Sequence, residues 1–171
     1  AGGVSVTIPG AEIMPSLQSG VIDAVEFAGP WSDLAFGFHK IAKYYYGPGF
    51  HEPGATLELT VNRALWDDLP VHLQTIVAQA AAAENQRMLS EFTAGNTASL
   101  IALRDDHGIE PTPMPDEVIR ELRRLSEDVV AETAALGDIN RRIYENWSRF
   151  RAQVAALAPF TEQGALNQRN L

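Results

Sequence analysis

The feature that most constrains the fold is a long helical pattern from Pro70 to about Asp106. Apolar side chains recur there at roughly helical spacing, at Leu73, Ile76, Val77, Ala80, Leu89, Phe92, Leu100 and Leu103. A helix of about 37 residues would be ~55 Å long at 1.5 Å per residue. Because such a helix exceeds the width of a small domain, we expect it to run along a larger body or to join two lobes.

The residues before this helix differ from it in composition. Residues 1–61 are rich in Gly, Pro and aromatic side chains, whereas residues 62–157 are rich in Ala and follow a helical pattern. The apolar runs and turn signals of the first region predict strands at 4–8, 21–27 and 56–61, helices at 11–19 and 31–43, and a loop at 44–54. The run Val21–Phe27 is apolar enough to be buried on both faces, as a strand of a parallel sheet is.

The second region is predicted to consist of helices separated by Gly and Pro. Asn62 has the position of a helix N-cap, and Pro115 begins a helix whose first turn carries Asp116 and Glu117. Besides the long helix, the expected elements are helices at 62–67, 115–136 and 138–156, a short strand at 109–112 and an extended polar tail from residue 159.

The composition excludes several classes of function. A net charge of −9 without a basic stripe argues against nucleic acid as a partner. The absence of Cys excludes disulfides, thiolate metal sites and thiol nucleophiles, and no apolar run approaches the ~20 residues that span a bilayer. The first residues show no charged and apolar leader. A mature chain and a cytosolic protein are alternatives, but we expect a fragment whose start lies upstream.

Two carboxylates lie beside aromatic side chains in turn-rich stretches. Glu26 ends a predicted strand next to Phe27, and Glu52 lies in a loop rich in Gly and Pro. A carboxylate beside apolar rings costs free energy unless a cation satisfies it. Together with the main-chain carbonyl of Phe27, the two acids could bind Na⁺, Ca²⁺ or Mg²⁺. The alternatives are a helix cap or Arg partner for Glu26 and an exposed loop acid at Glu52.

Catalysis is not predicted. The four His residues are scattered without zinc-site spacing, and no GxSxG, P-loop or GxGxxG motif occurs. The many aromatic side chains between residues 27 and 50, Trp31 among them, most often build core. Around a polar cleft they also form the apolar walls that small-molecule sites need.

Three stretches carry a family resemblance: residues 9–13, residues 17–37 and residues 40–54, the last including Tyr-Tyr-Tyr-Gly-Pro-Gly-Phe-His-Glu-Pro-Gly. Together with Trp66-Asp-Asp-Leu-Pro in the helical half, they resemble the DctP-type periplasmic solute-binding proteins of TRAP transporters. The resemblance is to the branch that binds 2-oxo or 2-hydroxy monocarboxylates with a metal cation. It implies an α/β fold that is part of a two-lobed periplasmic binding protein with long bracing helices.

The resemblance also implies the site residues. Glu26 and Glu52 would give side-chain oxygens, and Phe27 its main-chain carbonyl, to a Na⁺ or Ca²⁺ ion. The substrate would lie against these residues and Trp31. Relatives usually have Trp where Phe27 stands, and often where Phe50 stands. They run to about 300 residues or more, the size of two ordinary domains. The chain therefore resembles a C-terminal portion, and the Arg and Gln that complete the family's site belong to the rest.

The sequence thus predicts the substrate-binding subunit of a TRAP transporter. Residues 1–61 would hold the ligand and cation site, and residues 62–171 would form a helix-rich region with C-terminal dimerisation helices. The subunit would be a periplasmic homodimer that is not an enzyme and passes a small organic acid to membrane subunits for import. The alternative is a helical dimerisation or scaffold module with structural acids, which the apolar face with Trp147 and Phe150 supports.

Overall fold

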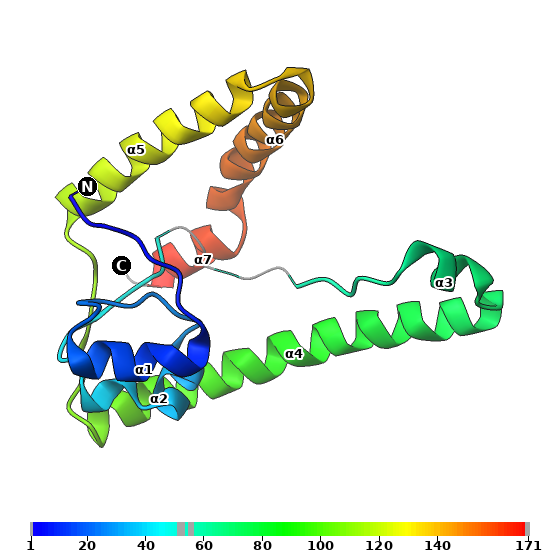
Figure 1. Cartoon of the computed structure of the whole chain (residues 1–171). Helices are drawn as coiled ribbons and strands as arrows, with labels where there is room; N and C mark the ends of the chain where they lie inside the picture. The colour runs from blue at the N-terminus through cyan, green and yellow to red at the C-terminus, as the bar shows by residue number, and fades with distance from the viewer. Residues whose placement is uncertain (1, 51–53, 55–56, 170–171) are drawn as a thin grey trace. The chain divides into compact units, whose positions relative to one another are not determined.

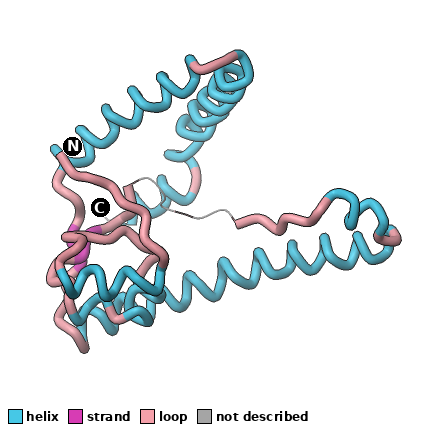
Figure 2. The backbone as a smooth tube through the Cα atoms, in the orientation of Figure 1, coloured by secondary structure: helices cyan, strands magenta, loops and turns pink. Residues whose placement is uncertain are grey.

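A computed structural model of the chain describes residues 2–50, 54 and 57–169 (Figure 1). Most of these residues are helical, and each strand is two residues long (Figure 2). In chain order the elements are α1 (Gly10–Ser19), α2 (Pro30–Phe36), the 3-10 helix η1 (Phe38–Lys40), β1 (Tyr45–Tyr46), α3 (Arg63–Asp68), α4 (Val71–Asp105), β2 (Pro111–Thr112), α5 (Asp116–Ala135), α6 (Asp138–Leu157), the 3-10 helix η2 (Ala158–Phe160) and α7 (Glu162–Arg169). Within the described part of the chain, no helix is both long enough and apolar enough for a membrane span.

The chain divides into two compact units. The first is Gly3–Met114, with α1 to α4 and both strands, and the second is formed from Pro115 onward together with Gly2. The most deeply buried large apolar side chains in the described residues are Ile13, Phe38 and Leu103, which are 7%, 5% and 2% exposed. All three belong to the first unit, so its core draws on α1, η1 and the last turns of α4.

The predicted long helix is confirmed as α4. Its 35 residues give a length of ~52 Å at 1.5 Å per residue. It ends where Gly108 adopts the left-handed conformation, with φ 67°. The N–H groups of Gly108 and Ile109 donate to the carbonyl oxygens of Arg104 and Leu103, at 3.1 and 2.9 Å. This pair of hydrogen bonds satisfies the last carbonyls of a helix and requires a residue that tolerates positive φ.

The other predicted helices differ in how well they match the structure. Those at 11–19, 62–67, 115–136 and 138–156 are confirmed to within two residues as α1, α3, α5 and α6. Asn62 caps α3 as predicted, because its Oδ1 accepts a hydrogen bond from the Leu65 N–H at 3.2 Å. The helix expected at 31–43 is wrong in length. It ends at Phe36, because Gly37 turns the chain with φ 78°, and η1 follows.

The strands expected at 4–8, 21–27 and 56–61 are wrong for the residues that the structure describes, all of which lie in loops there. An extended segment becomes a strand only when a neighbouring strand pairs its N–H and C=O groups. Val4 and Val21, for example, are 92% and 73% exposed. Apolar runs and turn signals therefore predicted strands for segments that have no pairing partner in the described part of the chain.

The strand pairing in the described residues is short. β1 and β2 pair in parallel, with Tyr45 opposite Pro111 and Tyr46 opposite Thr112, and the Gly47 N–H extends the ladder to the Thr112 carbonyl at 3.1 Å. The strand expected at 109–112 is thus confirmed in part. The loop expected at 44–54 is corrected, because it begins with β1. This pairing anchors the start of the loop to the chain that follows α4.

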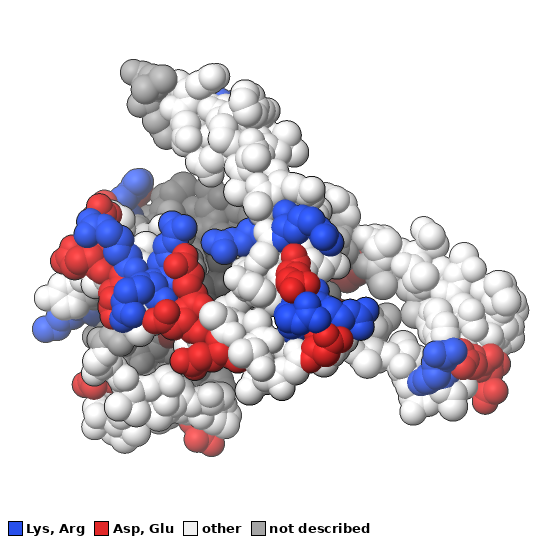
Figure 3. Space-filling view, turned by 90° about the horizontal axis from the view of Figure 1, so that it is seen from above, with Lys and Arg blue, Asp and Glu red and all other residues white. Residues whose placement is uncertain are grey.

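In the second unit, α5 and α6 contact each other. Gly137 lies at the break between them, as the sequence predicted. Their solvent-facing sides carry ion pairs at helical spacing: Arg120–Asp116, Arg123–Glu127, Arg124–Asp128 and Arg141–Glu145. Basic and acidic side chains are accordingly intermingled on the face drawn in Figure 3. Exposed pairs of this kind contribute little to stability, so we expect apolar packing to hold this helix pair together.

The extended tail expected from residue 159 is wrong, because η2 and α7 form there. The Ala165 N–H donates to the Thr161 carbonyl at 3.0 Å in the first turn of α7. Glu162 lies in that turn, where a negative charge favours the positive end of a helix. Gly164 lets α7 pack on η2, since a Cβ there would clash with the Pro159 carbonyl.

Candidate functional site

Glu26 and Phe27 lie in an irregular segment that leads into α2. Glu26 is exposed, and Phe27 is half-buried. The Phe27 ring packs against Phe36 and Phe38, with centroid distances of 4.8 and 5.3 Å. Aromatic pairs at these distances stabilise a fixed arrangement. The side chain of Phe27 is therefore part of the local core, which holds the backbone beside Glu26 in place.

Trp31 attaches the start of α2 to the long helix. Its indole lies edge-on to Phe92 of α4, with centroids 5.2 Å apart, and its backbone N–H donates to Asn96 Oδ1 at 3.0 Å. Gly95 lies directly beneath the ring, since a Cβ at that position would be 2.5 Å from the indole. Trp31 is still 41% exposed. It packs on α4 and leaves part of its indole open to solvent.

A buried carboxyl group lies behind this segment. Asp33 is 8% exposed, and its Oδ2 accepts a hydrogen bond of 2.6 Å from the Tyr45 hydroxyl of β1. Burial is the main cause that raises the Asp33 pKa, and hydrogen bonds from Tyr45 and the Gly29 backbone oppose it. Burial and the contact with Asp33 likewise raise the Tyr45 pKa. The pair joins α2 to β1, the strand that precedes Gly47.

Two histidines stack between η1 and the end of α4. The ring centroids of His39 and His107 are 4.1 Å apart. Burial lowers the His39 pKa, and the charges of His107 and Lys40 lower it further. The Nδ1 atom of His39 is buried without a hydrogen-bond partner among the described residues. We therefore assign this contact to the packing of the unit.

The structure brings only part of the sequence-predicted site together. Glu26, Phe27 and Trp31 lie near one another along the chain at the entrance to α2, whereas Glu52 lies outside the described residues. Within the described residues, no group of three or more His, Asp or Glu side chains could hold a metal ion. Glu26 offers the exposed carboxylate that a hard cation requires. These residues fit such a cation in the chemical type of their oxygen donors.

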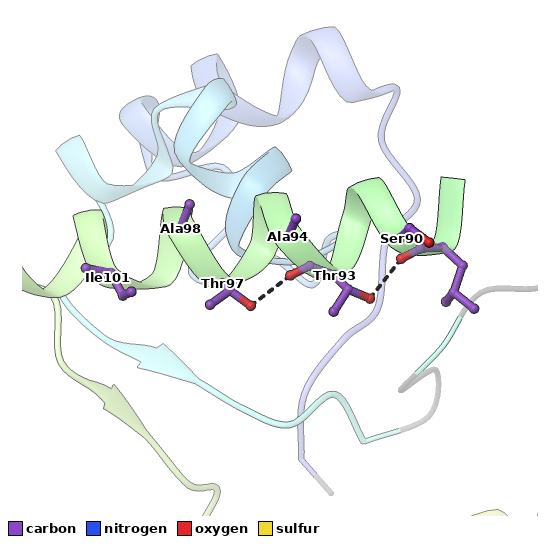
Figure 4. Close-up of a pocket in the computed structure, with 7 residues that line it drawn as sticks. Ser90, Thr93, Ala94, Thr97, Ala98 and Ile101 are labelled. Carbon is purple, nitrogen blue, oxygen red and sulfur yellow. Dashed lines mark hydrogen bonds between the residues drawn. The ribbon is translucent and has the colours of Figure 1, made fainter. Parts of the chain in front are cut away.

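A shallow groove lies elsewhere in the first unit, along one face of α4 (Figure 4). Its lining includes Leu89, Ser90, Ala94, Ala98 and Ile101 together with two threonines, Thr93 and Thr97. The threonine hydroxyls donate to the helix carbonyls of Leu89 and Thr93, both at 2.8 Å. This face is largely apolar and lacks the convergent polar groups of a small-molecule site. We interpret it as a packing surface.

Sequence reasoning missed Asp33, Tyr45 and Asn96. Each acts on a residue that is distant along the chain, so no local spacing or motif marks the contact. The signal that could have indicated Asp33 is an acid among apolar residues of a short helix. From the sequence pattern alone, Asp33 would be predicted to face solvent.

Comparison with known structures defines the class of protein. The fold matches a TRAP periplasmic solute-binding protein of Pseudoalteromonas atlantica with bound sodium and pyruvate (TM-score 0.88, 34% identity, 95% of this chain and 49% of that one). It also matches a TRAP transporter solute-binding protein of Bordetella bronchiseptica (TM-score 0.90, 30% identity, 96% of this chain and 48% of that one). The latter is a mixed-occupancy dimer with copurified calcium and picolinate in one active site and an apo second site.

Sequence comparison gives the family. The model of the DctP family, bacterial extracellular solute-binding protein family 7, matches residues 1–136, and the chain belongs to this family. It is 37% identical over 155 residues to a monocarboxylate 2-oxoacid-binding periplasmic protein of Nostoc sp., covering 90% of this chain and 42% of that protein. The chain thus spans about half the length of these relatives. The predicted family, fold class and periplasmic localisation are confirmed.

Proposed function

We propose that the protein carrying this chain is the substrate-binding subunit of a TRAP transporter. It captures a small 2-oxo or 2-hydroxy carboxylate through a bound cation and passes it to the membrane subunits. It performs no chemistry on the ligand. The observation that carries this proposal is the close match to two solute-binding proteins that each hold a cation together with a carboxylate. The same match disfavours a purely structural helical module.

The two ligands of these relatives have a chemical feature in common. Pyruvate and picolinate both place a second donor atom, a keto oxygen or a ring nitrogen, beside the carboxylate. Such a ligand can bind one cation through both donors. We infer that the substrate of this protein has the same feature. The cation then selects the 2-oxo or 2-hydroxy end of the acid, while the remainder of the molecule is recognised by shape.

The proposed cation ligands in this chain are Glu26, the main-chain carbonyl of Phe27, and Glu52. Carboxylate and carbonyl oxygens are the donors that Na⁺ and Ca²⁺ prefer. The packing of the Phe27 ring against Phe36 supports the role of its main chain, because a ring fixed on the core side restricts the backbone. The exposed part of the Trp31 indole provides an apolar wall for the substrate.

Calorimetry tests the proposal on the full-length protein that carries this sequence. We expect pyruvate or a longer 2-oxo acid to bind in Na⁺ or Ca²⁺ and to bind poorly after removal of both cations. Glu26→Gln and Glu52→Gln should each weaken cation-dependent binding on the order of tenfold or more. Glu58→Gln is the matched control, because Glu58 is an exposed acid of the neighbouring loop. Wild-type affinity in the first two variants would refute the cation bridge.

We also propose that the protein is a homodimer that associates through α6. The exposed apolar side chains of this helix include Ile143, Trp147, Phe150 and Val154, and one structural relative is a dimer. Sedimentation analysis of the double variant Trp147→Ser/Phe150→Ser should show a monomer that still binds its ligand. An unchanged dimer would place the contact elsewhere.

A further inference from the structure

Two histidines connect η1 to the chain that follows α4. His39 belongs to η1, and His107 lies just beyond the last residue of α4. The centroids of their rings are 4.1 Å apart, and the ring planes are inclined by 30°, so the rings form a tilted stack. His39 is half-buried and His107 is exposed. The contact therefore lies at the surface of the first unit, where solvent reaches both residues.

The segment that follows α4 is attached to the chain after η1 at two places. The His stack is the first, and the pairing of β2 with β1 is the second. The Gly47 N–H adds a hydrogen bond of 3.1 Å to the Thr112 carbonyl. A two-stranded ladder of this length is marginal by itself in water. We therefore expect the His stack to contribute much of the attachment of residues 107–112.

Protonation disturbs this stack in two ways. A neutral imidazole carries a proton on one ring nitrogen, whereas the charged form carries a proton on both. The Nδ1 atom of His39 is buried without a hydrogen-bond partner among the described residues. In the charged ring, the N–H at that atom would be a buried donor without an acceptor, which costs free energy. A positive charge on His107 would in addition lie directly against the first charge and repel it.

The charged groups around His39 act in the same direction. Burial is the main cause that lowers the His39 pKa, and the charges of His107 and Lys40 lower it further. The end of α4 carries three more charged residues, of which the first two pair with each other at 2.7 Å: Arg104, Asp105 and Asp106. The described charges that act on the His39 pKa are thus those of basic groups, so acid increases the repulsion at this contact.

We propose that the His39–His107 stack is an acid-released latch, which fixes residues 107–112 to η1 while the rings are neutral and releases them when both rings are protonated. Histidine is the side chain that ordinarily changes its charge between pH 5 and pH 8. The release is a local opening of the segment after α4, of the kind that leaves the rest of a unit folded. The inference is independent of the proposed function, because it concerns only contacts within the first unit.

Hydrogen exchange of the full-length protein at pH 7.5 and pH 5 tests the latch, with the rates corrected for the intrinsic effect of pH. The reporters are the N–H groups of Ile109 and Gly47, which donate to the carbonyls of Leu103 and Thr112. His107→Phe keeps a ring on His39 that cannot be protonated, and His107→Ser removes the ring. His72→Phe is the matched control, because His72 is another exposed histidine, at the start of α4.

In wild type we expect the protection of both reporters to fall about tenfold between pH 7.5 and pH 5, the effect of one pKa unit of interaction between two charges. His107→Phe should keep its protection within about twofold at both pH values, because its stack cannot become charged. His107→Ser should be about tenfold less protected than wild type at pH 7.5 and should lose little more at pH 5. His72→Phe should behave as wild type.

A contact that serves packing alone gives a different pattern. An equal loss of protection at pH 5 in wild type and His107→Phe would show that acid acts on another group, and no loss in wild type would show that the stack tolerates both protons. Either result overturns the proposal, as does wild-type protection of His107→Ser at pH 7.5. If His107→Phe does not fold, a further loss of about tenfold in His107→Ser at pH 5 would contradict the latch. Failure to bind 2-oxo acids would refute the proposed function and leave these outcomes unchanged.

Discussion

Gly95 of α4 is the position where a single methyl group should most directly disturb the attachment of α2. A Cβ built there would lie 2.5, 2.6 and 3.0 Å from Cδ2, Cε3 and Cε2 of Trp31. Real Cβ atoms essentially never approach other heavy atoms closer than 3.0 Å. The indole is rigid, and its edge is already in contact with Phe92. Gly95→Ala therefore forces the ring or the helix to move.

Two opposing terms set the size of the effect. Replacing Gly by Ala inside a helix stabilises it by about 1 kcal/mol. Inserting a methyl group into a packed contact costs about 1–3 kcal/mol. Because Asn96 also holds the backbone of Trp31, the ring has little freedom to move away, and we take the upper part of that range. The net expectation is a loss of about 1–2 kcal/mol in the free energy of unfolding.

Urea unfolding of Gly95→Ala, in the wild-type and in a Trp31→Ala background, measures both terms. Removing the indole removes the clash, so Gly95→Ala should there become stabilising by about 0.5–1 kcal/mol. The change of sign between the two backgrounds is the diagnostic result. If Gly95→Ala stabilises the protein in both, the indole does not lie on Gly95 and the reasoning fails.

Two further predictions concern the same unit. Asn96→Ala removes the acceptor for the Trp31 N–H and should lower the free energy of unfolding by about 1 kcal/mol in urea titration. Asn96→Asp keeps an acceptor, so its free energy of unfolding should fall by less. Equal losses in the two variants would contradict this prediction. Because the pKa of His39 is lower in the folded state, its contribution to stability is complete above its ordinary pKa and is lost as the pH falls through the lower folded value. His39→Gln should therefore show a shallower loss of stability between about pH 7 and pH 5, and an unchanged slope would show that His39 does not titrate there.

Helices could be predicted from this sequence because their signals are local. The period of apolar residues located α4, and Asn62 located the start of α3 by a cap that acts over one turn. The expected strands failed for the opposite reason. A strand needs a partner that lies elsewhere in the chain, and in the described residues only Tyr45–Tyr46 and Pro111–Thr112 have one.

For the candidate site as well, local features were predictable from the sequence and contacts between distant residues were not. Glu26 and Phe27 were predicted from adjacent residues and from a family resemblance, and their roles as cation ligands stay predictions. The contacts that hold this segment in place were not predicted. Asn96 meets the Trp31 backbone 65 positions away along the chain, which no sequence pattern encodes. The contacts of Trp31 with Asn96 and Phe92 follow from the packing of α2 on α4, which only the three-dimensional structure shows.

These supports connect the long helix α4 to the segment that carries the proposed cation ligands Glu26 and Phe27. A flexible segment with Glu26 would lose conformational entropy on binding a cation, and the affinity would fall accordingly. In this structure, contacts within the protein already order much of this segment. Phe27 is packed among aromatic rings, and Trp31 is fixed on α4. α4 thus serves as a rigid base for the segment that carries the proposed cation ligands Glu26 and Phe27. If these residues bind the cation, a perturbation on α4 as remote in sequence as Gly95 should weaken cation affinity together with stability.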